Sequence, residues 1–179
     1  KAWSTLKNLE DLVAVKRCLV LHDGEDGLSD AIQIGEMLRH FKTTVTLSPL
    51  EDYTTRTLDG FSHVFYVATN DGSRVPEALL SDIRLRRTVF CWLGHNISQA
   101  LDPYGPSLKL GLRYIDTVEG RFSSVQYKGR TLKKEAPWTD VLEVTDAGRC
   151  RVWAVAQDGL TTAPYALRSD RRFWYFADV

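Results

Sequence analysis

The sequence has no excess of either charge, because 23 Lys and Arg residues balance 23 Asp and Glu residues among 179. A protein that holds nucleic acid mainly by neutralising phosphates needs a surplus of basic side chains. The sequence also has no apolar run that approaches the roughly 20 residues needed to cross a bilayer. These two absences argue against nucleic acid as a partner and against a membrane span.

Cysteine is scarce, and the histidines lack metal-binding spacing. The three cysteines, Cys18, Cys91 and Cys150, show no paired spacing of the kind found in zinc sites, and an odd number cannot form a complete disulfide framework. Cys18 and Cys91 lie in strongly apolar runs, which favours small core residues. None of the four histidines forms an HxxxH or HExxH pair. We therefore expect neither a metal nor a cofactor.

The first half alternates apolar runs with amphipathic segments. Strands are predicted over 13–21, 43–47, 63–68 and 89–93. Helices are predicted from Ser29 or Asp30 to Phe41, from Pro76 to Leu85, and over 97–101. Continuously apolar runs such as Cys18–Leu21 are typical of strands buried on both faces of a parallel sheet. This βαβ rhythm predicts an α/β fold with a mostly parallel sheet of the flavodoxin or Rossmann type.

The pattern changes after Pro103–Pro106 to short alternating segments separated by turn residues. These segments predict strands over 114–118, 123–127, 141–145, 150–156 and 173–176. Such a series is typical of antiparallel β structure. We expect residues 1–105 to form a Rossmann-like α/β domain and residues 106–179 to form a β-rich antiparallel extension that packs on the same domain.

Aromatic residues concentrate in the β-rich half. They are Trp138, Trp153, Tyr165, Phe173, Trp174 and Tyr175. Rings of this kind usually fill cores, and they also form stacking surfaces for sugars. We favour the core for these side chains and keep the stacking surface as the alternative.

Polar side chains follow three of the predicted parallel strands. Ligands of open α/β sheets bind beyond the carboxyl ends of the strands, near the point where strand order reverses. The residues that would reach this edge are His22, Asp23, Glu25, Asp26, Asn70, Asp71, His95 and Asn96. We predict that they line a binding cleft, with the acidic turn His22–Gly27 at its centre.

The residues of this acidic turn limit the kinds of ligand that it could bind. Its three carboxylates disfavour phosphate, and it matches neither the dinucleotide fingerprint nor the Walker pattern. Carboxylates suit hard cations, yet acidic residues also favour helix N-termini, and helix capping is the interpretation we prefer.

Glutamine-amidotransferase-like folds place a nucleophilic cysteine at a sharp turn after a central strand. Here Gly94 occupies that turn and Cys91 lies three residues earlier, so the nucleophile is missing.

Six segments, taken in order, carry a resemblance over most of the chain. They are Gly60–Val67, Thr88–Asn96, Leu110–Tyr114, Val125–Gly129, Ala163–Ser169 and Phe173–Asp178. Together they resemble a family of bacterial polysaccharide-deacetylase-like proteins. In that family this portion looks like the Rossmann-like, glutamine-amidotransferase-like domain that precedes a deacetylase barrel. The Asp-Asp and His-x-x-x-His motifs that hold the metal of the barrel have no counterpart in this sequence.

The resemblance implies an accessory domain of a carbohydrate-active enzyme rather than the catalytic unit. It implies an extracytoplasmic location, and it implies a polysaccharide and an adjacent deacetylase domain of the parent chain as partners. Two other functions stay open. One is a hydrolase that uses the carboxylates at the sheet edge together with His95 as acid and base. The other is a structural or docking domain with an empty cleft.

Overall fold

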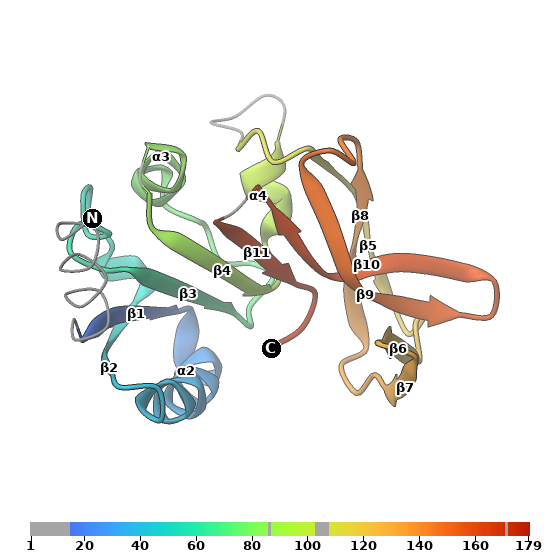
Figure 1. Cartoon of the computed structure of the whole chain (residues 1–179), viewed down its shortest axis with the longest axis horizontal. Coiled ribbons are helices and arrows are strands. Elements are labelled where there is room, and N and C mark those ends of the chain that lie inside the picture. Colours follow the sequence, from blue (N-terminus) through green and yellow to red (C-terminus); the bar gives the residue numbers. More distant parts are fainter. Residues whose placement is uncertain (1–14, 86, 103–107, 171) are drawn as a thin grey trace, which may run out of the picture.

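Five parallel strands form the centre of the molecule. The computed structural model describes residues 15–85, 87–102, 108–170 and 172–179. The parallel strands are β1 (Lys16–His22), β2 (Thr43–Pro49), β3 (His63–Ala68), β4 (Val89–Gly94) and β11 (Phe173–Phe176). They lie in the order β2-β1-β3-β4-β11 (Figure 1). The order reverses beside β1, which is the position where open α/β sheets present their ligand sites.

Helices cover both faces of this parallel region. They are α2 (Gly24–Arg39), α3 (Glu77–Leu85) and α4 (Ile97–Leu101), with a short 3-10 turn, η1 (Leu50–Asp52), after β2. On one face of the sheet, α2 packs Ala31 against Val20 and Val67. On the opposite face, α3 and α4 contribute Leu79 and Ile97 to the main core (Figure 1). The parallel strands are thus buried on both sides, as their continuous apolar runs predict.

Antiparallel strands extend the central sheet beyond β11. They are β10 (Thr161–Ser169), β9 (Cys150–Asp158), β6 (Ser124–Tyr127) and β7 (Arg130–Lys133), and they complete a nine-stranded sheet. A separate two-stranded sheet is formed by β5 (Leu112–Glu119) and β8 (Trp138–Val144). Phe122, Ala156 and Ala163 pack with Val118 and Val141 between this small sheet and the long one. The result is a mixed α/β fold with a mostly parallel central sheet plus antiparallel strands, compatible with a Rossmann-like fold.

The sequence-based predictions succeed best where the pattern is local. The bounds predicted for β3 and α4 are confirmed. The expected start of α2 at Ser29 or Asp30 is wrong, because the helix begins at Gly24 and the supposed acidic turn is its first turn. Two strands, β7 and β10, were not predicted at all. The proposed extension is also not wholly antiparallel, since β11 pairs with β4 in parallel.

Other sequence-based predictions have mixed outcomes. The expected beginning of the first strand at residues 13–14 and the boundary at 103–106 lie outside the described residues, and the division into two domains stays a prediction. The core interpretation of the aromatic residues holds for Phe173 and Tyr175, which are buried. It is wrong for Trp138, which is 42% exposed, and for Trp174, which faces a surface groove.

Gly94 ends β4 in a conformation that glycine alone adopts easily. Its φ is +86°, and a Cβ built on it would lie 2.2 Å from the Ala68 carbonyl oxygen of β3. The close approach lets β4 turn sharply toward α4, so that the His95 N–H donates to the same carbonyl at 2.9 Å. The edge of the sheet that carries the predicted cleft therefore depends on this glycine.

We predict that Gly94→Ala destabilises the protein by at least about 1 kcal/mol more than Gly129→Ala does. Gly129 also has a positive φ, +76°, but no atom lies within 4 Å of its built Cβ, so its substitution should cost only the left-handed backbone term of about 1–2 kcal/mol. Urea unfolding of both variants measures the difference. Equal losses would show that the approach to Ala68 relaxes freely.

Candidate functional site

Asp23 is a buried carboxylate at the point where the ends of three parallel strands meet. Its side chain accepts hydrogen bonds from the Tyr66 hydroxyl at 3.1 Å, the Thr69 backbone N–H at 2.8 Å and the Thr69 hydroxyl at 3.0 Å. The Asn70 N–H lies 3.3 Å from it and the Asn96 amide 3.5 Å. Residues after β1, β3 and β4 are therefore connected through one charged group. We call these five residues the Asp23 network.

The network explains why Asp23 is not a helix cap. Asp23 occupies the N-cap position of α2, yet its side chain makes no capping hydrogen bond. The preferred capping interpretation is thus wrong for Asp23. It holds in part for Glu25 and Asp26, whose carboxylates lie in the exposed first turn of α2, where the helix dipole favours negative charge. Burial and the Asp23 charge both raise the pKa of Tyr66, so its hydroxyl stays a donor.

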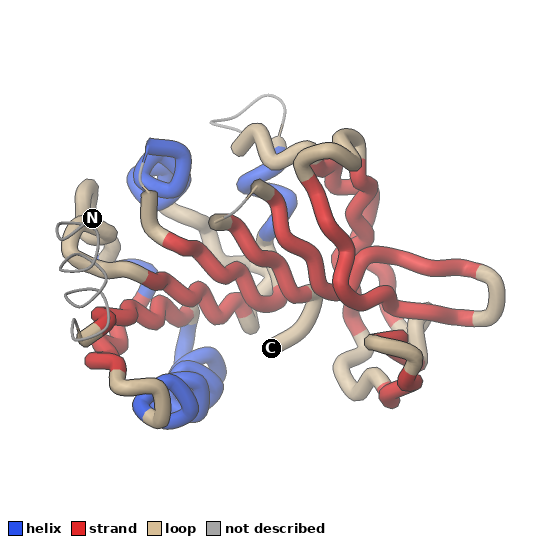
Figure 2. Tube along the Cα trace, in the orientation of Figure 1, coloured by secondary structure: helices blue, strands red, loops and turns tan. Residues whose placement is uncertain are grey.

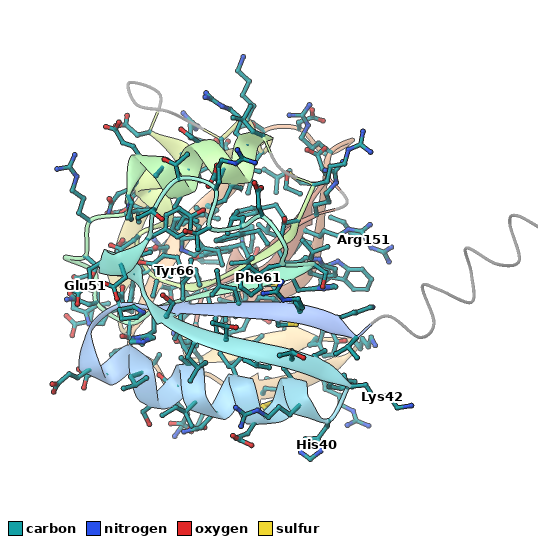
Figure 3. The ribbon with its side chains drawn as sticks, turned by 90° about the vertical axis from the view of Figure 1, so that its left-hand side faces the viewer. His40, Lys42, Glu51, Phe61, Tyr66 and Arg151 are labelled. Atoms are coloured by element: carbon teal, nitrogen blue, oxygen red, sulfur yellow. The ribbon has the colours of Figure 1, made fainter. Side chains whose placement is uncertain are left out.

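An open cleft of about 390 Å³ lies beside the network, at the carboxyl ends of β1 and β2. Its polar lining includes His22, Glu25, Glu51, Ser73 and Arg74. We call it the rim cleft. Figure 3 shows Glu51 and Tyr66 toward the end of the molecule where β1 ends, and Lys42 toward the end where β1 begins. The cleft therefore occupies the edge at which the sequence places the site.

The loop that supplies Ser73 and Arg74 is held by α4. The Gln99 side chain donates to the Ser73 carbonyl oxygen at 2.8 Å and accepts from the Val75 N–H at 2.9 Å. Asn96, which precedes α4 in a left-handed conformation with φ of 69°, donates its amide to the Asn70 carbonyl oxygen at 2.7 Å. Side chains after β4 thus fix the loop after β3. One wall of the rim cleft is preorganised in this way.

The eight predicted site residues fall into four groups. Three of them line the rim cleft: His22, which is buried with Nδ1 3.2 Å from the Gly24 carbonyl oxygen, Asp23 and Glu25. Asn70 and Asn96 belong to the Asp23 network. Asp71 and His95 lie elsewhere, within electrostatic reach of Asp140. Asp26 is exposed and is not among the residues that line the cleft.

Asp140 is a buried acid that sequence reasoning missed. It lies on β8, is 3% exposed, and accepts a hydrogen bond from the Thr117 hydroxyl at 2.6 Å. Burial raises its pKa, the Asp71 charge raises it further, and the Thr117 hydrogen bond and His95 oppose the rise. The available signal was the polar pair Thr139–Asp140 directly before the apolar pair Val141–Leu142, since such polar residues are rarely buried without a partner or a role.

A second buried polar cluster surrounds Lys134 and Asp178. The Lys134 ammonium group is fully buried, forms an ion pair with Asp178 at 3.3 Å, and donates to the Trp138 carbonyl oxygen at 2.9 Å. Tyr165 donates to Asp178 at 3.4 Å, and burial together with the Asp178 charge raises the pKa of Tyr165 to about 12. These contacts join the two sheets through charged groups.

The cysteines do not supply a nucleophile. Burial raises the pKa of the Cys91 thiol to about 12, and thiolate, the reactive form, is therefore scarce at neutral pH. Burial also raises the pKa of Cys18 and of Cys150. At the sharp turn after β4 the chain carries Gly94, and the Trp92 indole donates to the His95 carbonyl oxygen at 2.7 Å. The residues of this turn, Gly94, His95 and Asn96, include no cysteine.

Within the described parts of the chain, no three His, Cys, Asp or Glu side chains are grouped so that they could hold a metal ion. The helices described there are also too short or too polar to cross a membrane.

Comparisons with known proteins bear on the fold. No family model and no curated protein matches the sequence. Among solved structures, the chain is similar to a Bacteroides uniformis protein described as ThuA-like, with a TM-score of 0.63, 9% identity, and coverage of 91% of this chain and 81% of that one. It is also similar to SMU.1228c, with a TM-score of 0.59, 9% identity, and coverage of 89% and 75%. At this identity the likeness shows a shared fold.

We predict that Asp23→Asn lowers the free energy of unfolding by about 3 kcal/mol, because hydrogen bonds to a buried charge contribute about 1.5–3 kcal/mol each and an amide cannot accept from the same set of donors. The matched control is Asp26→Asn on the exposed first turn of α2, which should stay within about 0.5 kcal/mol of the parent protein. Thermal and urea unfolding give both values. A loss at Asp26 that equals the loss at Asp23 would contradict the role of the network.

Proposed function

We propose that this chain is a non-catalytic accessory domain that binds a saccharide in the rim cleft, as part of a polysaccharide-deacetylase-like protein. The observation that carries the proposal is the mixed lining of the cleft. Glu25 and Glu51 are acceptors, whereas Ser73 and Arg74 are donors. Sugar hydroxyl groups donate and accept at once, so they suit a lining in which both kinds of group are present.

The size and floor of the cleft also support a small polar ligand. A volume of about 390 Å³ lies within the roughly 300–1,000 Å³ that is common for small-molecule sites. Leu28 and Leu50 give the lining an apolar part against which the C–H face of a sugar ring could lie. The carboxylates of Glu25 and Glu51 in this lining repel phosphate.

Binding fits this cleft better than catalysis. The Asp23 carboxylate is already engaged by its network, so it is a positioning group and not a free base. The turn after β4 carries no nucleophile. The assignment to a deacetylase-like protein, its exported location and an adjacent deacetylase domain as partner rest on the sequence resemblance. A flavodoxin-like or amidotransferase-like fold, with which the strand order is compatible, supports it.

We expect isothermal titration with neutral and N-acetylated tetrasaccharides to detect binding that Glu25→Gln and Arg74→Gln each weaken about tenfold, the scale of one lost hydrogen bond to a charged group. Asp26→Asn, one residue from Glu25 and outside the cleft, is the control and should bind as the parent does. No heat with any saccharide, or equal binding in the cleft variants, would remove the proposal.

A second function, a hydrolase, is favoured by one observation. Asp140 and Asp71 are carboxylates in unlike environments near His95, one buried with a raised pKa and one exposed. Pairs of titratable groups whose environments differ in this way often divide the roles of acid and base. In this arrangement protonated Asp140 is the acid, and His95 or Asp71 is the base.

If the chain hydrolyses a glycosidic or ester bond, Asp140→Asn should lower the turnover rate at least about a hundredfold, which is the usual contribution of a general acid. Because the raised pKa keeps Asp140 protonated to higher pH, activity should be present at low pH and fall as pH rises through that value. Chromogenic glycosides and acetyl esters provide the assay. Turnover that Asp140→Asn leaves unchanged would exclude this function.

A further inference from the structure

One face of the long sheet is open over its antiparallel half. The face that α2 covers at β1, β2 and β3 continues across β4, β11, β10 and β9, where no described helix lies on it (Figure 2). The opposite face of β9 and β10 is covered by the β5–β8 sheet through Phe122, Ala156 and Ala163. Among the described residues, one face of the long sheet is thus covered by α3, α4 and the β5–β8 sheet, whereas the other is covered only by α2.

A groove of about 380 Å³ lies on this open face. Its walls are aromatic and aliphatic, and the residues that matter here are Tyr127, Tyr165, Trp153, Trp174 and Phe176. The Trp153 and Trp174 rings are 6.0 Å apart and 30° from parallel, and the Trp174 and Phe176 rings are 6.4 Å apart and 10° from parallel. We call this surface the aromatic groove. It presents a row of nearly parallel rings.

Irregular strand pairing brings two of these rings into the groove. In the β9–β10 ladder, Ala154 pairs with Ala166 and the next pair is Val152 with Leu167, so Trp153 has no partner. Tyr165 is skipped in the same way on β10. An extra residue in a strand re-aims its side chain, and such bulges are common next to binding sites. Both skipped residues, on neighbouring strands, are among those that line the groove.

The groove is rimmed by positive charge. The guanidinium groups of Arg151 and Arg168 lie 4.1 Å and 5.5 Å from the ring centroids of Trp153 and Trp174, and the Lys128 ammonium lies 5.0 Å from that of Tyr127. None of the residues that line the groove is acidic. A ligand that lies on these rings therefore meets three cations and no carboxylate of the lining.

Two hydrogen-bond donors at the groove are buried without an acceptor. They are the indole N–H of Trp153 and the Nε–H of Arg168. A buried donor without a partner costs about 1–3 kcal/mol, and such groups in native proteins call for an explanation. Both atoms are buried, so neither N–H is presented directly to a ligand on the rings.

We propose that the aromatic groove binds an anionic saccharide, one whose sugar rings stack on Trp153, Trp174 and Phe176 and whose carboxylates pair with Arg151 and Arg168. A sugar ring offers an apolar face to aromatic rings and oxygen acceptors at its edge, and guanidinium groups bind carboxylates through paired hydrogen bonds.

The surface does not suit an acidic peptide or a nucleic acid as well. An extended peptide binds a sheet by adding a strand at an edge, but β9, β10 and β11 each have a strand paired on both sides. A nucleic acid requires a long basic track, and the chain has no net charge. The groove is separate from the rim cleft, because Figure 3 shows Arg151 and Glu51 toward opposite sides of the molecule. The inference thus goes beyond the proposed function.

The test compares ligands of equal length on the full chain. Isothermal titration with a hexamer of galacturonate should show binding at least about tenfold tighter than with a neutral glucose hexamer. Trp174→Ala should weaken the binding of both hexamers, and Arg168→Gln should remove the preference for the anionic one. Trp138→Ala, a tryptophan exposed outside the groove, is the control and should change neither affinity. Circular dichroism checks that each variant is folded.

Several results would overturn the inference. They are no binding of galacturonate hexamer by the parent protein, tighter binding of the neutral hexamer, of a glutamate hexapeptide or of an oligonucleotide, and galacturonate binding that Arg168→Gln leaves intact. Arg168→Gln removes charge without opening the core, so it decides the question even if Trp174→Ala does not fold. Glu25→Gln in the rim cleft should leave galacturonate binding unchanged, which separates this site from the one proposed above.

Discussion

The arrangement of the strand ends at the carboxyl edge of the sheet depends on the hydrogen bonds to one buried group, the carboxylate of Asp23. The buried carboxylate of Asp23 is satisfied by donors from Tyr66, Thr69, Asn70 and Asn96 that converge on it, and removal of one partner from such a set is costly. The ends of β1, β3 and β4 must therefore stop at the same level. The segments after β1 and β3 that border the rim cleft leave the sheet from that fixed point, and the segment after β2 completes the lining.

The faces of the long sheet are covered differently in the two halves of the chain. Beside β1 and β3, helices on both faces exclude water, and the polar groups gather at the strand ends. Beside β9 and β10, a small second sheet covers one face and the other keeps its rings partly exposed. The first arrangement makes a cleft at an edge, and the second makes a flat surface. A single fold thus offers two unlike places for ligands, one polar and one aromatic.

Local patterns in the sequence were sufficient for the bounds of β3 and α4, because an uninterrupted apolar run marks β3 and a short segment directly after the Gly94 turn marks α4. They were not sufficient for the start of α2, since a segment with two glycines and three acidic residues is typical of a turn. The hydrogen-bond donors that engage Asp23 come from distant parts of the chain, and a local pattern does not include them. β10 was missed because Pro164 and the skipped Tyr165 interrupt its alternation. The place of Asp140 near Asp71 and His95 depends on how the second sheet packs, and no spacing in the sequence encodes it.

The location of β11 has a consequence for the order of folding. Phe90 of β4 pairs with Phe173, far along the chain, and β11 separates β4 from β10. Until that strand is in place, β4 and β10 each present an unpaired apolar edge, which is a template for association with other chains. Pairings of such long sequence separation are slow to form. We therefore expect the pairing of β11 to govern the rate of folding. Once β11 is in place, the edges of β4 and β10 are both paired, and the sheet becomes a single cooperative unit.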